Sequence, residues 1–288
     1  MPPRVLHAAW PLERERLCLG SLLNVRQELE LVAQESAVDE VHLHFLRNGE
    51  PAPDACPPYA SEAFRSTWTF RLAPASRPER FDWPDEDGRW WPYESLLPVD
   101  RLRRQLGRMA HLTWAPSVLE EARRLKTHLA GERELICLHL KNQSGGPEES
   151  NASFDEWERF LSRPEVISDH TYLVLGDDRL PEDLLARPHV TAARSLGVSL
   201  GVQLALVTIA NGFIGMASGI AQAAVFSPSP YAIFKHPRHH VAEMVRELGE
   251  GDRFPLAGPH QRLIRQPDTE ANLFVAWQTL ITAARCAP

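Results

Sequence analysis

The sequence has little cysteine and no concentrated positive charge. Its four cysteines, Cys18, Cys56, Cys137 and Cys286, are widely separated and form no Cys-X-X-Cys pair. This spacing supports neither a structural zinc site nor a dense disulfide framework. The net charge is -7 and Lys and Arg form no stripe, which argues against nucleic acid as a partner. We therefore expect reduced thiols, no bound metal and no cofactor.

Segments that would direct the chain to a membrane are also missing. Charged residues occupy positions 13–16, where a signal peptide would need an apolar core. No apolar run reaches the about 20 residues that a transmembrane helix requires. We expect a cytoplasmic protein without a transmembrane segment. At 288 residues, of which 43% are apolar, the chain is long enough for two globular domains.

The most unusual absence is that of charge between Ser195 and Phe234. No Asp, Glu, Lys or Arg occurs there, although these residues make up 24% of the chain. Within this stretch, residues 211–226 (NGFIGMASGIAQAAVF) contain three glycines. Asn211-Gly212 and two later prolines divide the stretch into short pieces, which is typical of the interior of a parallel α/β domain.

The second half of the sequence alternates between strand-like and helix-like segments. Continuous apolar runs predict strands at residues 134–140, 170–178, 190–194, 212–216 and 231–235. Between them, helices are predicted at residues 153–164, 183–188, 199–210 and 218–226, the first with Ser153 as its N-cap. This alternation predicts a parallel sheet with right-handed crossovers. A last helix, at residues 269–285, carries an apolar stripe made of Leu273, Phe274, Trp277, Leu280 and Ile281.

The first half contains one clear βαβ unit, with strands at residues 4–10 and 38–46 around a helix at residues 20–36. Two segments rich in proline and acidic residues, 47–64 and 72–98, follow without a clear period and are predicted to be mainly loops. Helices are expected at residues 100–112 and 117–131. The predicted fold class is α/β, with two Rossmann-like lobes at residues 1–125 and 126–288 and parallel sheets flanked by helices.

Residues 199–235 (SLGVQLALVTIANGFIGMASGIAQAAVFSPSPYAIFK), with the strand ends at 139–143 and 175–178, resemble the donor half of GT-B glycosyltransferases. The similarity is to members of the heptosyltransferase and fucosyltransferase type. In such enzymes a strand ending in Ile-Gly leads to a Ser-Gly turn, which opens a helix of small residues beneath the nucleotide-sugar diphosphate. The residues that follow the family pattern, including the helix before this strand, are Leu204, Ala205, Leu206, Ala210, Phe213, Ile214, Gly215, Ser218, Gly219, Ala223 and Ala224.

The resemblance implies that residues 1–125 bind an acceptor and residues 126–288 bind a nucleotide-sugar donor. The implied activity is metal-independent transfer of a sugar from a nucleotide-diphosphate sugar to an unknown acceptor. Two alternatives on the same fold are a nucleotide-sugar epimerase or hydrolase and a non-catalytic nucleotide-sugar-binding protein. The last is kept because Ala217 and Gln222 stand where heptosyltransferase-type members usually carry an acid and a histidine.

Candidate donor-binding residues follow three predicted strands, where ligands bind in open α/β sheets. Lys141 can neutralise a diphosphate, whereas His139 is compatible with a core position or with a phosphate contact. The glycine-rich turn either lets the backbone approach a phosphate or only permits tight packing of helix on sheet. Asp177 either accepts from a ribose hydroxyl or caps its own turn. The full set is His139, Lys141, Asn142, Gly176, Asp177, Met216, Ala217, Ser218 and Gly219.

Two groups of residues have more than one interpretation. Residues 235–240 (KHPRHH) lack the ligand spacing of a metal site and are either solvated surface or a donor-phosphate contact. An inverting transfer also needs a general base, and spacing singles out none of the candidates in the first half. These are His7, His42, His44, Glu62, Asp82, Asp85, Glu86 and Asp87. Interleaved aromatic residues either stack on a sugar ring or anchor a loop, namely Trp83, Trp90, Trp91 and Tyr93.

Overall fold

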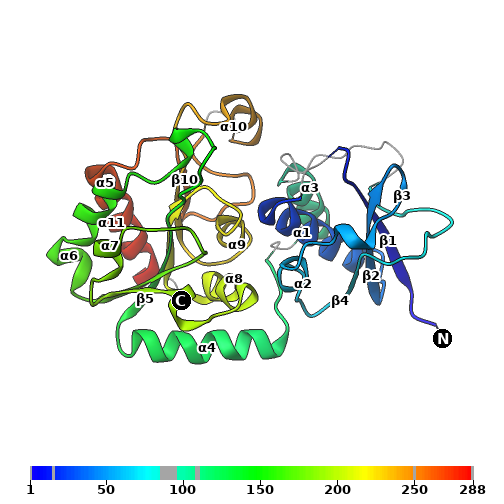
Figure 1. The fold of residues 1–288 in the computed structure, drawn as a ribbon, viewed down its shortest axis with the longest axis horizontal. Helices are drawn as coiled ribbons and strands as arrows, with labels where there is room; N and C mark the ends of the chain where they lie inside the picture. The colour runs from blue at the N-terminus through cyan, green and yellow to red at the C-terminus, as the bar shows by residue number, and fades with distance from the viewer. Residues whose placement is uncertain (1, 15–16, 85–95, 108–110, 249–250, 287–288) are drawn as a thin grey trace. The chain divides into compact units, whose positions relative to one another are not determined.

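The structure is a computed structural model that describes residues 2–14, 17–84, 96–107, 111–248 and 251–286. The chain divides into two compact units, Met1–Pro116 and Ser117–Pro288, here called unit 1 and unit 2 and described separately (Figure 1). Several residues considered above as acceptor-side candidates lie outside the described residues, namely Asp85, Glu86, Asp87, Trp90, Trp91 and Tyr93.

Unit 1 is built on the predicted βαβ motif. Strand β1 (Val5–Pro11) pairs in parallel with β2 (Glu40–Arg47), and helix α1 (Leu19–Glu35) connects them. Strand β4 (Thr69–Leu72) extends this sheet in parallel, and the two-residue β3 (Glu50–Pro51) pairs antiparallel with the end of β2. The short strand β3 falls inside the segment predicted as loop. The remaining described helices are η1 (Pro53–Ala55), α2 (Ala60–Ala63) and α3 (Leu96–Leu106).

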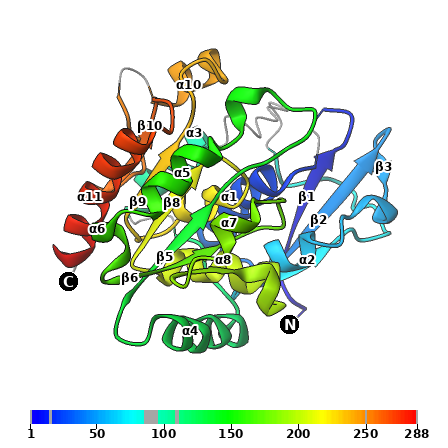
Figure 2. The same cartoon turned by 60° about the vertical axis from the view of Figure 1, so that its left-hand side comes forward.

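The two faces of the β1–β2 pair differ in composition, because successive side chains of a strand point to opposite faces. One face is fully apolar and buried, formed by Leu6, Ala8, Trp10, Val41, Leu43 and Phe45. The other face carries His7, His42 and His44. Figures 1 and 2 show α1, α2 and α3 together on one side of this sheet.

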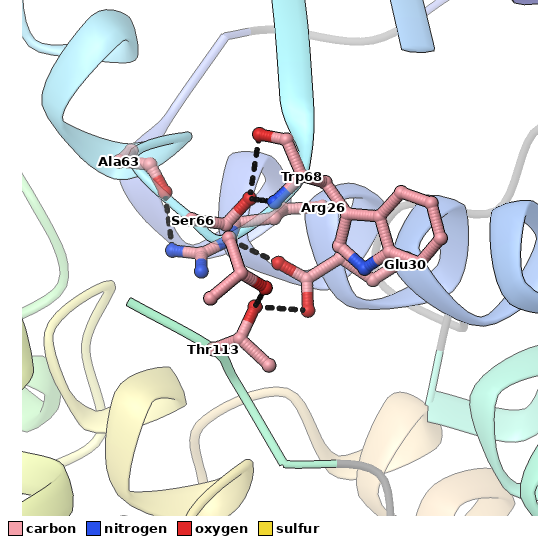
Figure 3. A network of polar contacts seen from close by, with 7 residues as sticks. Arg26, Glu30, Ala63, Ser66, Trp68 and Thr113 are labelled. Carbon is pink, nitrogen blue, oxygen red and sulfur yellow. Dashed lines mark hydrogen bonds and ion pairs between the residues drawn. The ribbon is translucent and has the colours of Figure 1, made fainter. Parts of the chain in front are cut away.

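A buried ion pair lies at the centre of unit 1 (Figure 3). Arg26 and Glu30 are one helical turn apart in α1, their Nε and Oε1 atoms are 2.9 Å apart, and neither side chain is exposed. Arg26 Nη1 donates to the carbonyl oxygen of Ala63, and Thr113 Oγ1 donates to Glu30 Oε2. The guanidinium also lies 4.4 Å from the centre of the Trp114 ring. The pair therefore connects α1 to α2 and to the segment after α3.

Unit 2 contains a six-stranded parallel sheet with the order β10-β9-β8-β5-β6-β7. The chain starts at β5, builds outward to β7, and then returns to the other side of β5 for the last three strands. This is the strand order of a Rossmann fold, in which the direction of winding reverses between the first and fourth strands. The strands are β5 (Glu134–His139), β6 (His170–Val174), β7 (Val190–Ala192), β8 (Gly212–Met216), β9 (Tyr231–Phe234) and β10 (Gln261–Ile264).

Helices cover both faces of this sheet. In Figure 1, α5, α6, α7 and α11 lie on one side of the sheet and α8 and α9 on the other. The predicted apolar stripe of α11 is confirmed, because Leu273, Trp277, Leu280 and Ile281 are buried in the main core cluster and Phe274 packs against it. The helices are α4 (Pro116–Ala130), α5 (Phe154–Leu161), α6 (Pro164–Ile167), α7 (Glu182–Leu185), α8 (Leu200–Ile209), α9 (Ala221–Val225), α10 (Val241–Leu248) and α11 (Glu270–Cys286).

Ser153 precedes α5 as predicted, but its hydroxyl does not cap the helix. The hydroxyl donates instead to Asp268 Oδ1, at 2.9 Å. The other carboxylate oxygen accepts from the backbone N–H of Ser153 and from the indole Nε1 of Trp157, both at 2.8 Å. Asp268 is only 5% exposed, so its charge is satisfied by hydrogen bonds rather than by water.

Several elements differ from the sequence-based expectation. Besides β3, the strands β4 and β10 and the helices α2 and α10 were not predicted, and α9 has five residues rather than the nine expected at 218–226. β10 is a short edge strand in which buried Gln261 and Leu263 alternate with partly exposed residues, so it lacks the continuous apolar run of the central strands. None of the described helices combines the length and the apolar composition needed to cross a bilayer.

Candidate functional site

The candidate donor residues lie at the carboxyl ends of neighbouring strands in the unit 2 sheet. Lys141 follows β5, Gly176 and Asp177 follow β6, and Ser218 follows β8, and these three strands are parallel neighbours in the order β8-β5-β6. The reversal of winding falls between β5 and β8. At such a point the connections leave in opposite directions and open a crevice at the carboxyl ends of the strands.

His139 is the last residue of β5 and is part of the packed structure. It is 4% exposed, and its Nδ1 lies 3.1 Å from the carbonyl oxygen of Leu175, which assigns the proton to Nδ1. Burial lowers the pKa of His139, although the Leu175 carbonyl partly offsets this effect. The imidazole thus links the end of β5 to the turn after β6.

Gly176 is required by this packing. Its φ is +89°, and a Cβ atom would lie 3.1 Å from the His139 ring. Its backbone N–H donates to Oε1 of Gln203 in α8, at 2.8 Å. Both the backbone conformation and the neighbouring ring therefore exclude a side chain here. The turn after β6 is fixed from two sides.

Asp178, rather than Asp177, stabilises the loop that carries Lys141. Asp178 Oδ1 accepts from the backbone N–H of Asn142 at 2.8 Å, and the Asn142 side chain donates to the carbonyl oxygen of Arg179. Asp177 is exposed and makes no such capping bond among the described residues. The structure thus gives Asn142 a positioning role between two loops.

The Lys141 side chain is partly buried and is not used by the fold. Among the described residues, no hydrogen bond or ion pair is formed by its ammonium group. Burial lowers its pKa, and the charge of Asp178 partly offsets the shift. A buried cation without a partner is costly, so this position favours an anion that enters from solvent.

The loop after β8 offers free backbone donors. Ala217 N–H still pairs with the carbonyl oxygen of Phe234 at 2.8 Å, which continues the β8–β9 ladder. Within the described part of the chain, the next three N–H groups, those of Ser218, Gly219 and Ile220, have no acceptor. Ser218 Oγ accepts from Ala221 N–H. Because α9 is so short, these loop donors matter more than a helix dipole.

The glycines of this segment have different roles. A Cβ atom on Gly215 would lie 2.8 Å from the backbone nitrogen of His139 and closer still to its carbonyl oxygen. Gly215 therefore permits the close approach of β8 to its neighbouring strand β5, which is a different contact from the packing of helix on sheet considered for this segment. Met216 is 3% exposed and belongs to the same core. Ser218 and Gly219 are partly exposed, so the loop itself remains accessible to a ligand.

A second lysine follows the next strand of the sheet. Lys235 directly follows β9, and burial lowers its pKa to about 8. Its Nζ lies 3.4 Å from His240 Nδ1, and it forms no ion pair among the described residues. Glu243 and Glu247 favour its charged form, whereas Lys141 and Arg265 disfavour it. The charges of Lys141 and Lys235 thus repel each other at the carboxyl ends of the strands.

The rest of the 235–240 segment contains both exposed and partly buried side chains. Neither solvated surface nor a phosphate contact therefore describes every residue of it. Arg238 is exposed and pairs with Glu149 at 3.3 Å. The rings of His239 and His240 are in contact, with their centroids 4.0 Å apart and their planes tilted by 42°. Burial and the neighbouring cations lower the pKa of His239 to about 4.

In unit 1, three of the candidate bases meet. His7 Nδ1 lies 3.1 Å from His44 Nε2, and the His7 and His42 rings are in edge contact. Asp82 accepts from the backbone N–H of His7, and Glu62 lies apart in α2. The structure supports an anchoring role for Trp83, which is 8% exposed and donates from its indole nitrogen to Glu28.

Comparison with known proteins identifies the fold. No model of a known protein family matches the chain, and no curated protein matches it. A glycosyl transferase family 9 structure from Veillonella parvula matches with 12% identity and a TM-score of 0.57, covering 97% of both chains. Heptosyltransferase WaaC from E. coli, solved with ADP-2-deoxy-2-fluoro heptose, matches with 13% identity and a TM-score of 0.46, covering 97% of this chain and 99% of its own.

A third match is the NodZ α-1,6-fucosyltransferase soaked with GDP-fucose, with 12% identity and a TM-score of 0.42 over 78% of this chain and 93% of its own. At these identities only the fold is transferred. The chain has the GT-B glycosyltransferase fold, as the sequence resemblance implied.

Proposed function

We propose that this protein is a glycosyltransferase that moves a sugar from a nucleotide-diphosphate donor to an acceptor, without a metal at the diphosphate. Unit 2 binds the donor and unit 1 contributes the acceptor side. In the reaction, an acceptor hydroxyl attacks the anomeric carbon, the bond from that carbon to the diphosphate oxygen breaks, and a base takes the hydroxyl proton. The leaving diphosphate gains negative charge, which must be stabilised.

One observation carries this proposal. Two partly buried lysines, Lys141 and Lys235, follow β5 and β9, and the loop between Ala217 and Ile220, with its free N–H groups, follows the intervening strand β8. Cations that form no ion pair within the described part of the chain, together with free backbone donors, suit a diphosphate. They lie beside the reversal of winding, where α/β sheets bind nucleotides.

The proposed roles of the individual residues follow from their exposure. Lys141 and the N–H groups of Ser218 and Gly219 contact the diphosphate. Gly176 and Asp177 lie at the neighbouring strand end, where the exposed Asp177 carboxylate is available to a ribose hydroxyl. The buried His139 and Met216 position these groups from within the fold, the exposed Asn142 holds the two loops together, and Ala217 continues the sheet. The base that accepts the hydroxyl proton is not assigned.

Nucleotide titration tests the donor site. Isothermal titration calorimetry with ADP, GDP and UDP is expected to show binding of at least one diphosphate, and CMP serves as the monophosphate comparison. Lys141→Gln removes one charge-assisted contact, so affinity for that diphosphate is expected to fall by roughly ten- to a hundredfold, equivalent to about 1.5–3 kcal/mol. Lys141→Arg keeps the charge and is expected to lose less.

The matched control is Lys126→Gln, in α4. Lys126 is also partly buried, but its Nζ donates to the carbonyl oxygen of Ile209 at 2.7 Å, just before the start of β8 and thus at the opposite end of the strands from Lys141. This variant is expected to bind the diphosphate like the parent. If the parent binds no diphosphate, or if Lys141→Gln binds as tightly as the parent, the donor site is wrong. Diphosphate binding without turnover of any nucleotide sugar would instead favour the non-catalytic alternative.

A further inference from the structure

The three histidines of unit 1 meet because of strand register. His7 of β1 is the register partner of His42 in β2, and His44 is two residues further along β2. Residues two apart on a strand point to the same face, and so do register partners on adjacent strands. All three imidazoles therefore project from one face of the sheet, although His7 and His44 are 37 residues apart in the sequence.

The geometry brings one nitrogen from each ring close to the other two. One candidate ligand atom from each of His7, His42 and His44 lies within 4.8 Å of the others, and His7 Nδ1 and His44 Nε2 are 3.1 Å apart. Tetrahedral coordination at about 2.0–2.1 Å puts ligand nitrogens about 3.4 Å apart. Small movements of the rings would therefore produce a metal-binding arrangement.

Surrounding groups orient two of the rings. Glu40 Oε2 lies 2.9 Å from His42 Nε2 and is itself held by Arg71, at 2.7 Å. This arrangement leaves His42 Nδ1 for a ligand and reproduces the carboxylate–histidine contact that accompanies most metal-bound imidazoles. His44 is 1% exposed, and its Nδ1 has no partner among the described residues. Nε2 is thus the only nitrogen of this buried ring with a polar contact, and it faces the cluster.

The three imidazoles cannot satisfy one another fully, because a single N–H···N bond pairs only two of the three. A cation that accepts all three lone pairs resolves this.

We propose that His7, His42 and His44 bind one divalent transition-metal ion of the Zn²⁺ class, with the fourth coordination position open to water. Imidazole ligands suit Zn²⁺ rather than Mg²⁺ or Ca²⁺, which prefer oxygen. Three protein ligands with one open position are typical of a zinc site that also binds a small ligand. The site would be additional to the diphosphate site of unit 2 and does not depend on it.

Metal titration of the full chain provides the test. After treatment with a chelator and its removal, the protein is titrated with ZnCl₂ by calorimetry, and with Co²⁺ to record the visible absorption of tetrahedral Co²⁺. One equivalent of each is expected to bind. His7→Ala and His42→Ala are expected to weaken Zn²⁺ binding more than a hundredfold, and Glu40→Gln, which only orients His42, by about 10- to 100-fold. Circular dichroism and thermal unfolding of each variant check that it is folded.

The control variant removes a second close pair of histidines. His239→Ala/His240→Ala abolishes the two adjacent rings after β9 and is expected to leave the Zn²⁺ stoichiometry and affinity unchanged. Three results overturn the proposal: no Zn²⁺ binding by the parent, unaltered binding by folded His7→Ala and His42→Ala, or loss of binding in the control. His44 is not used for the test, because its variants alter a buried position.

Discussion

Arg26 and Glu30 form an ion pair in α1 with neither side chain exposed, at 2.9 Å. Desolvation raises the pKa of Glu30, and the adjacent guanidinium opposes that shift. Arg26→Met would leave the carboxylate buried and unpaired, so we expect the free energy of unfolding to fall by about 3–5 kcal/mol. Urea denaturation followed by tryptophan fluorescence and circular dichroism measures the loss.

The double variant Arg26→Met/Glu30→Leu makes this prediction specific. Apolar replacement of both partners removes the unpaired charge, so the double variant is expected to be more stable than Arg26→Met. Arg101→Met, at an exposed position of α3, is the control and is expected to change stability by no more than about 0.5 kcal/mol. Equal stability of Arg26→Met and Arg101→Met would show that the buried pair is not important for unit 1.

Gly215 provides a second prediction, about the packing of β8 on β5. A methyl group there would overlap the backbone of His139, and backbone in a central sheet cannot move aside. Gly215→Ala is therefore expected to cost about 3 kcal/mol or more, at or above the upper end of the range for overpacking. Thermal and urea unfolding are the measurements.

Gly146→Ala is the matched control for this change. An added Cβ would lie 3.6 Å from Ser150 Oγ, an ordinary contact, in an exposed loop. We expect its effect to be within about 0.5 kcal/mol. If Gly215→Ala is as mild as Gly146→Ala, the close approach of the two strands does not restrict this position.

The α/β alternation of unit 2 could be predicted because its central strands are buried on both faces. Strands such as β5 and β8 then appear in the sequence as continuous apolar runs, which differ clearly from the surrounding loops. The edge strand β10 has no such run, since only every second residue is buried. The charge-free stretch similarly predicted a buried segment, but the length of α9 depends on tertiary packing rather than on the pattern.

The candidate sites were predictable only in part. Lys141 could be predicted, because it follows a recognisable buried strand and parallel strands end at a common edge. The burial of Lys235 depends on the packing of residues around β9 and is not visible in the segment KHPRHH. The histidine cluster depends on the register of two strands whose pairing cannot be obtained from residue spacing. The hydrogen bonds of Asp268 to Ser153 and Trp157 were likewise not predictable, because these partners lie 115 and 111 positions away in the sequence.

The pKa of Lys235, about 8, predicts a pH dependence with opposite signs for binding and for stability. Above this pKa the ammonium loses its proton, so affinity for a nucleoside diphosphate is expected to fall by about tenfold between about pH 7 and pH 9.5. Stability without ligand behaves differently, because in the unfolded chain this lysine stays protonated up to its usual pKa near 10.5. Since the unfolded state then binds more protons, the contribution of Lys235 to stability rises with pH between about 8 and 10.5.

Lys235→Arg separates these effects, because arginine stays charged throughout this range. We expect its diphosphate affinity to change little between about pH 7 and pH 9.5, and the rise in stability above pH 8 to be smaller than in the parent. Titration calorimetry at several pH values measures the first effect, and urea unfolding at the same pH values measures the second. Lys126→Arg is the control and is expected to retain the fall in affinity seen in the parent. A parent whose diphosphate affinity does not decrease above pH 8 would show that Lys235 is not a ligand of the diphosphate, even if Lys141 is.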